Sequence, residues 1–171
     1  MLKYFAGIGS REAPQNILDK MSVLSYELTN AGYTLRSGHA EGADYAFEKD
    51  AQQADIYLPW SRFNYIKLGS FAHHNYYVVP TTDKEAFESV SRFHPKPSML
   101  SPGAIKLMAR NYRQIVGQNG KPNSEFVICW TKNGEKIGGT AQAIKIAESF
   151  NIPVYNLFHE ELYDFILENK T

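Results

Sequence analysis

The sequence predicts an α/β fold in which helices cover both faces of one doubly wound, mainly parallel sheet. Short apolar runs, typical of buried strands, alternate with amphipathic helical patterns over the first 59 residues. Three loops rich in glycine and small polar residues begin at Gly9, Ser37 and Gly138, after such runs or at the start of a helix. In open α/β sheets, ligands bind beyond the carboxyl ends of the strands. The loops therefore predict a binding site at that edge.

The first part of the chain predicts the order β-α-β-α-β. Each strand segment is short and apolar, and each helix segment repeats apolar residues at helical spacing. Pro14 suits a first helical turn, and Pro59 ends the last strand of the series. This order implies right-handed crossovers and a Rossmann-like sheet. The expected elements are strands at 3–8, 33–37 and 55–59 and helices at 14–32 and 41–54.

The stretch from 60 to 100 has no sustained period and contains three prolines, Pro80, Pro95 and Pro97. We expect an irregular insertion over the site, within a single domain spanning 1–171, because this stretch is too short and irregular to have its own core. Regular structure resumes at Ser101, whose hydroxyl suits a helix cap. The remaining expected elements are helices at 101–116, 140–150 and 162–167 and strands at 125–130 and 154–157.

Composition limits the partners that the chain could have. Its 171 residues include 18 Lys and Arg and 18 Asp and Glu, so no global basic field favours strong non-specific binding to a polyanion. The only cysteine, Cys129, lies in an apolar run and is expected to be a buried strand thiol in a reducing compartment. No apolar stretch approaches the ~18 residues of a membrane helix. We therefore expect a cytoplasmic protein with no membrane partner.

The three loops are expected to converge, because the carboxyl ends of parallel strands meet at one edge of a sheet. Arg11 is placed to bind a phosphate bidentately, and the hydroxyls of Ser10 and Thr140 could donate hydrogen bonds to it. Gly38 and Gly42 are expected to allow positive φ and close approach of a ligand. The alternative, tight turns beside a solvated Arg11, explains one such loop better than three. The expected ligand-binding residues of the loops are Gly9, Ser10, Arg11, Ser37, Gly38, Gly138, Gly139 and Thr140.

Four further polar residues are candidates for the site. Glu41 and Asp44 are candidate catalytic carboxylates or ribose ligands, because a three-residue spacing places both near one face of a helix. Helix capping is the alternative for Glu41, whereas Asp44 is expected to be buried and hydrogen-bonded, as a ligand contact or as a tie between loops. Arg110 and Asn111 interrupt an apolar helix face. They either reach the site, Arg110 to an anion and Asn111 to a base or sugar, or face solvent.

Other motifs are weaker or absent. Trp60, Arg62 and Phe63 follow the third strand and are candidates for stacking on a base, with core or lid packing as the alternative. The histidine pair His73-His74 has no cysteine or paired carboxylate at metal spacing, so neither a metal nor a cofactor is expected. The sequence contains no complete P-loop and no HExxH pattern.

The ordered set of motifs resembles that of the SLOG superfamily of Rossmann-like proteins. This superfamily includes the DprA/Smf DNA-processing proteins, the LOG cytokinin-activating phosphoribohydrolases and the YspA/YpsA-like proteins. The resemblance covers almost the whole chain except 60–100. It is carried by Gly7-Ile8-Gly9-Ser10-Arg11, by Ser37-Gly38-His39-Ala40-Glu41-Gly42-Ala43-Asp44, by Ala109-Arg110-Asn111, and by Gly138-Gly139-Thr140 followed by Ile152-Pro153-Val154.

The resemblance implies that the three loops bind nucleotides or nucleic-acid phosphates. Our leading hypothesis is a protein that binds a nucleotide or a nucleotide-derived small molecule. Whether it is an enzyme is left open: cleavage of an N-glycosidic bond would use Glu41 or Asp44. The catalytic glutamate that follows the LOG glycine motif has no counterpart, because Ala141-Gln142-Ala143 follows Thr140.

The alternative hypothesis is a DprA-like DNA-processing module that binds single-stranded DNA. In this reading Arg11, Arg36 and Arg62 contact phosphates, and Trp60 or Phe63 stacks on bases. The sequence leaves homo-oligomerisation open under both hypotheses.

Overall fold

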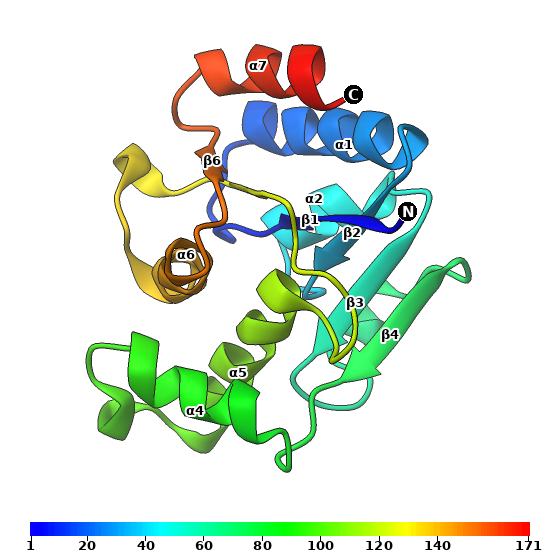
Figure 1. Ribbon diagram of the computed structural model, residues 1–171. Helices are drawn as coiled ribbons and strands as arrows, with labels where there is room; N and C mark the ends of the chain where they lie inside the picture. Colours follow the sequence, from blue (N-terminus) through cyan, green and yellow to red (C-terminus); the bar gives the residue numbers. More distant parts are fainter.

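The computed structural model describes all 171 residues and contains one six-stranded sheet (Figure 1). The strand order is β4-β3-β2-β1-β5-β6, and every neighbouring pair is parallel. This arrangement confirms the expected α/β fold, with a sheet that is entirely parallel. The strands are β1 (Lys3–Gly7), β2 (Tyr33–Ser37), β3 (Ala54–Leu58), β4 (His74–Val78), β5 (Val127–Cys129) and β6 (Val154–Asn156).

Helices cover both faces of the sheet (Figure 1). They are α1 (Gln15–Asn30), α2 (Ala43–Lys49), α3 (Tyr65–Leu68), α4 (Lys84–Phe93), α5 (Pro102–Val116), α6 (Gly138–Ser149) and α7 (Glu161–Lys170). Successive strand residues point to opposite faces. In β1, Phe5 therefore packs in the core cluster beneath α1, α2 and α7, whereas Ala6 packs in the cluster beneath α5 and α6. Helix α4 packs against α5.

The strand order reverses between β1 and β5. After β1 the chain adds β2, β3 and β4 on one side, and it then crosses back to place β5 on the other side of β1. Such a switch point opens a crevice at the carboxyl ends of the two strands, because the loops that follow them run to opposite faces of the sheet. Residues after β1 and β5 are therefore positioned for a ligand.

The expectation of an irregular insertion at 60–100 is wrong. This stretch contains β4, which pairs with β3 from Ala54↔His74 to Leu58↔Val78, and helix α4. The edge strand β4 mixes polar and aromatic residues, so it lacks the continuous apolar run of a central strand. Asp83 caps the start of helix α4, because its carboxylate accepts the Ala86 N–H at 3.2 Å.

The helix expected at 41–54 is also shorter than predicted. It begins only at Ala43, because Gly42 has φ +80° and cannot be part of the helix. It ends at Lys49, before the turn that leads into β3. Positive φ was expected at Gly42 and at Gly38. It is confirmed at Gly42 but not at Gly38, and the other residue of this loop with positive φ is His39, at +59°.

Two smaller expectations are also tested. Cys129 is buried in β5, as predicted, and burial raises the pKa of its thiol to about 12. None of the helices combines the length and the apolar character that crossing a membrane requires.

Candidate functional site

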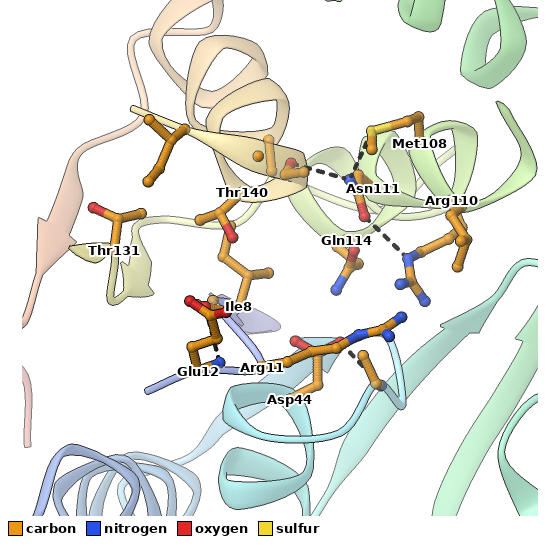
Figure 2. Close-up of a pocket in the computed structure, with 18 of the residues that line it drawn as sticks. Ile8, Arg11, Glu12, Asp44, Met108, Arg110, Asn111, Gln114, Thr131 and Thr140 are labelled. Atoms are coloured by element: carbon orange, nitrogen blue, oxygen red, sulfur yellow. Dashed lines mark hydrogen bonds between the residues drawn. The ribbon is translucent and has the colours of Figure 1, made fainter. Parts of the chain in front are cut away.

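A cavity of about 450 Å³ lies at the switch point of the sheet (Figure 2). Its walls come from residues 8–12 after β1, from Ala40 and Asp44 around the start of α2, and from one face of α5. The remaining wall comes from residues within 131–143, a stretch that runs from the end of β5 into the first turns of α6. Of the expected ligand-binding residues, those that line it are Gly9, Ser10, Arg11, Asp44, Arg110, Asn111, Gly138, Gly139 and Thr140. Segments more than a hundred residues apart in the sequence thus meet in one cavity.

Two guanidinium groups define the cationic end of the cavity. Arg110 is only 6% exposed, and it donates hydrogen bonds to the carbonyls of Gly38 and, at 3.4 Å, of Tyr57. Its Nε donates to Asn111 Oδ1 at 3.0 Å, whereas its Nη2 makes no hydrogen bond within the chain. Figure 2 shows this guanidinium pointing towards Arg11. Arg11 is exposed and makes no ion pair, so both groups are available to an anion.

Asp44 lies on the same side of the cavity as the two arginines (Figure 2). It is buried, as expected, and accepts the Ala40 N–H at 3.2 Å. Burial raises the pKa of its carboxyl, and the charge of Arg110 opposes that rise without a direct salt bridge. Asp44 therefore ties the loop after β2 to the start of α2 and partly balances the charge of Arg110.

A second acid and a histidine are buried behind this end of the cavity. The ring nitrogen His39 Nδ1 lies 2.6 Å from Glu48 Oε1, and the backbone N–H of His39 donates to Glu48 Oε2 at 2.9 Å. Both side chains are fully buried. His39 Nε2 lies 2.8 Å from the Gly69 carbonyl, which can only accept, so this nitrogen carries a proton. A further proton is then shared between Nδ1 and the carboxyl group, and the pair is neutral overall.

The His39–Glu48 pair retains its shared proton to higher pH than the separated groups would. Burial raises the pKa of Glu48, against the opposing effect of His39. Burial by itself would lower the pKa of His39, but the hydrogen bond and charge of Glu48 outweigh it and raise that pKa. The folded protein thus holds a proton on this pair where an unfolded chain, with a histidine pKa of 6.5, would release it.

We expect the replacement Glu48→Gln to change how stability depends on pH. Above pH 6.5, until the pair releases its shared proton, the parent holds up to one more proton folded than unfolded, so its unfolding free energy falls by up to ~1.4 kcal/mol per pH unit. In the folded variant His39 is neutral, so below pH 6.5 the unfolded chain binds more protons than the folded one. The unfolding free energy of the variant therefore rises as pH approaches 6.5 and levels off above it. Asp44 and His74, which also face His39, titrate in both proteins. Chemical denaturation at several pH values measures the two slopes, and equal slopes would contradict the shared proton.

Ser37 and Gly38 do not line the cavity, contrary to expectation. The Ser37 hydroxyl is fully buried and donates to the Gly7 carbonyl at 2.7 Å, so it ties β2 to β1. A Cβ on Gly38 would lie 2.6 Å from Arg110 Nη1 and 2.8 Å from Gln114 Nε2. Glycine at this position therefore makes room for Arg110, and not for a ligand.

Glu41 also lies outside the cavity. Because α2 begins after it, Glu41 does not share a helix face with Asp44. It pairs with Lys67 Nζ at 2.6 Å, and this partner lowers the pKa of the Glu41 carboxyl. Of the two candidate catalytic carboxylates, only Asp44 lines the cavity.

The first turn of α6 forms the wall opposite β1. Gly138, Gly139 and Thr140 open this helix without a side-chain cap or an acidic residue, and Gly138 has φ +66°. Free N–H groups and the positive end of the helix dipole therefore lie at the cavity that Arg11 also lines. The Ser10 hydroxyl accepts the Glu12 N–H at 2.9 Å, which fixes the loop after β1.

Asn111 connects α5 to α6. Its Nδ2 donates to Gln142 Oε1 at 2.9 Å and to the Gly139 carbonyl at 3.5 Å, while its Oδ1 accepts from Arg110. These contacts occupy the amide that we expected to reach a base or sugar. In this conformation Asn111 orients Arg110 and holds the start of α6.

The sequence did not reveal several residues of the cavity wall. Met108 and Ile137 supply apolar surface, and Ile137 is half exposed. Gln114 also lines the cavity, and Lys132 is its third cationic side chain, after Arg11 and Arg110. Helical spacing from Arg110 predicts Gln114 on the same face, which was the available signal. No local pattern distinguishes Lys132 from other surface lysines.

The aromatic and basic residues that we expected to contact single-stranded DNA differ in their exposure to solvent. Arg36 is fully buried, with its guanidinium 3.7 Å from the centre of the Tyr4 ring, so its expected contact with a phosphate is wrong. Phe63 is buried 5.5 Å from the Arg110 guanidinium. Trp60 and Arg62 remain exposed.

Comparisons with known proteins support the fold. No protein-family model and no curated protein matches this sequence. The chain is similar to a solved structure of DNA processing protein A from Helicobacter pylori, which is described for its mode of binding single-stranded DNA. The TM-score is 0.59 at 16% sequence identity, and the match covers 98% of this chain and 81% of the other. At this identity the likeness establishes a shared Rossmann-like fold with a DprA protein.

Proposed function

We propose that the cavity binds single-stranded DNA through a backbone phosphate and one adjoining nucleotide. The observation that carries this proposal is the buried Arg110, whose Nη2 has no partner, beside the exposed Arg11 and the uncapped start of α6. These donors line one cavity from three segments of the chain, which suits the binding of a phosphate. The similar DNA processing protein A is described as binding single-stranded DNA, which favours a strand over a free nucleotide.

The charge of the cavity is consistent with an anionic ligand. Its lining contains three cationic side chains, Arg11, Arg110 and Lys132, and two acidic ones, Glu12 and Asp44. The cavity therefore has a positive balance although the whole chain has a net charge of zero. Such local focusing binds a strand at specific phosphates without the general polyanion affinity of a basic protein.

The size and the apolar wall suit a single nucleotide. A volume of about 450 Å³ lies in the lower half of the usual ligand-pocket range of ~300–1,000 Å³. Leu107, Met108 and Ile137 line the side towards α5 and α6 and offer contact to a sugar or base. One nucleotide would enter, and the flanking backbone would continue over the sheet edge.

A free nucleotide or nucleotide derivative is the second candidate ligand, favoured by the same single-nucleotide volume. Cleavage of an N-glycosidic bond at this site would require a carboxyl group at the anomeric carbon. Asp44 is the carboxylate for that role, and its raised pKa would suit a proton donor.

We expect Arg11→Ala to weaken binding of a thymidine oligonucleotide by ~1.5–3 kcal/mol, the typical value of a charge-assisted hydrogen bond. Loss of one phosphate contact should also reduce the slope of log K against log salt by ~0.7. Arg92→Ala, an exposed arginine on α4, is the matched control and should change neither value. Fluorescence anisotropy across a salt series measures both effects.

The same titration separates the two ligands. Much tighter binding of the oligonucleotide than of thymidine monophosphate, with a salt slope in the parent larger than the ~0.7 expected of one phosphate, supports the single strand. Weak oligonucleotide binding that the mononucleotide displaces would favour the second candidate. Oligonucleotide affinity that is equal in the parent and in Arg11→Ala would remove Arg11 from the site.

A further inference from the structure

Trp60 lies beside the cavity, at the same edge of the sheet. It follows the carboxyl end of β3, and its side chain is 40% exposed. Its ring meets the ring of Phe63 edge to face, with the centroids 5.2 Å apart. Phe63 in turn lies 5.5 Å from the guanidinium of Arg110. A short series of contacts therefore leads from the cationic end of the cavity to an exposed indole.

The surroundings of Trp60 favour a nucleic-acid strand over other occupants. Residues 56–82 contain no acidic side chain, and the exposed Arg62 lies two positions from Trp60. Phe63 is buried, and Tyr65 packs against His39 and Tyr76, so neither offers an open platform. Trp60 has Phe63 as its one aromatic partner. An exposed indole beside a cation is the combination on which single strands stack their bases.

We propose that Trp60 is a second subsite, a stacking platform for a base that flanks the nucleotide held in the cavity. This inference rests on the proposed binding of single-stranded DNA. The two distances of 5.2 and 5.5 Å that link Trp60 to Arg110 amount to about three nucleotides even at the compact ~3.4 Å spacing of a duplex strand. A hexanucleotide therefore reaches both subsites, whereas a mononucleotide reaches only the cavity.

Hexathymidylate and thymidine monophosphate are the probes. In a Trp130→Phe variant, Trp60 is the only tryptophan left, because the chain has two. We expect hexathymidylate to quench its fluorescence and thymidine monophosphate to leave it unchanged. In the otherwise unchanged protein, Trp60→Ala should weaken binding of labelled hexathymidylate about tenfold, within the usual range for one stacked base. Trp60→Phe should recover most of that affinity.

Ile66→Ala is the matched control, because this side chain is fully exposed in the same segment and makes no contact with the cavity. It should bind hexathymidylate as the parent does. Tight binding that is unaffected by Trp60→Ala, with no quenching, would overturn the subsite and leave the proposed function standing. Failure of the parent to bind hexathymidylate at all would overturn both.

Discussion

Replacing Arg110 with methionine is expected to weaken binding of single-stranded DNA more than tenfold. The guanidinium is the only cation that reaches the cavity from a buried position, and methionine retains its bulk without its charge or donors. Loss of a charge-assisted hydrogen bond to phosphate accounts for ~1.5–3 kcal/mol of binding. The variant should also lose ~1–3 kcal/mol of stability, because the carbonyl of Gly38 loses its partner and Asp44 loses its nearby cation.

Arg113→Met provides the matched control for this prediction. Arg113 is a buried arginine on the same helix, but it pairs with Asp83 at 2.8 Å and lies outside the cavity. Its loss should also destabilise the fold and leave DNA affinity unchanged. Anisotropy titrations and chemical denaturation on both variants separate binding from stability. If the two variants lose affinity equally, Arg110 acts through the fold and not through the ligand.

Gly38→Ala is expected to reduce DNA binding by displacing Arg110. The added Cβ would lie 2.6 Å from Arg110 Nη1, closer than real Cβ atoms approach. Gly38 does not have positive φ, so the backbone accepts alanine and the strain falls on the guanidinium. We expect at least a tenfold loss of affinity together with ~1–3 kcal/mol of destabilisation from overpacking.

Gly103→Ala is the control for the glycine replacement. Gly103 lies in the first turn of α5, and a Cβ there would meet no atom within 4 Å. Alanine should stabilise this helix by up to ~1 kcal/mol and leave affinity unchanged. Undiminished binding by Gly38→Ala, measured in the same titration, would show that the position of Arg110 does not matter for the ligand.

Much of the fold follows from local sequence signals. Strand β2 occupies the predicted residues 33–37, because Gly32 and Gly38 delimit a short segment with Tyr33 and Leu35 at alternate positions. Helix α5 begins as expected after Ser101, whose hydroxyl accepts the Ala104 N–H at 3.2 Å. Strand β4 escaped prediction because an edge strand has one neighbour and partly solvated side chains. Its pairing with β3 depends on the sheet, and not on a pattern of its own.

The site was predictable to the level of loops but not of side chains. The topology of a parallel sheet brings the loops at Ser10 and Gly139 together, as the sequence indicated. It does not fix where Ser37 points, and that hydroxyl turned out to bond inside the sheet. The burial of Arg110 depends on the carbonyl of Gly38, 72 residues away, and no local pattern encodes that contact.

Amide chemical-shift mapping with hexathymidylate tests the proposed site most directly. The chain has a mass of 19.4 kDa, which suits two-dimensional nitrogen–proton spectra. We expect the largest shifts at the amides of Ser10, Arg11, Gly139 and Thr140 and at the Trp60 indole. The Arg113 side chain lies outside the cavity, and its Nε–H signal should shift little. Shifts that gather elsewhere on the chain, with the cavity amides unmoved, would contradict DNA binding at the switch point.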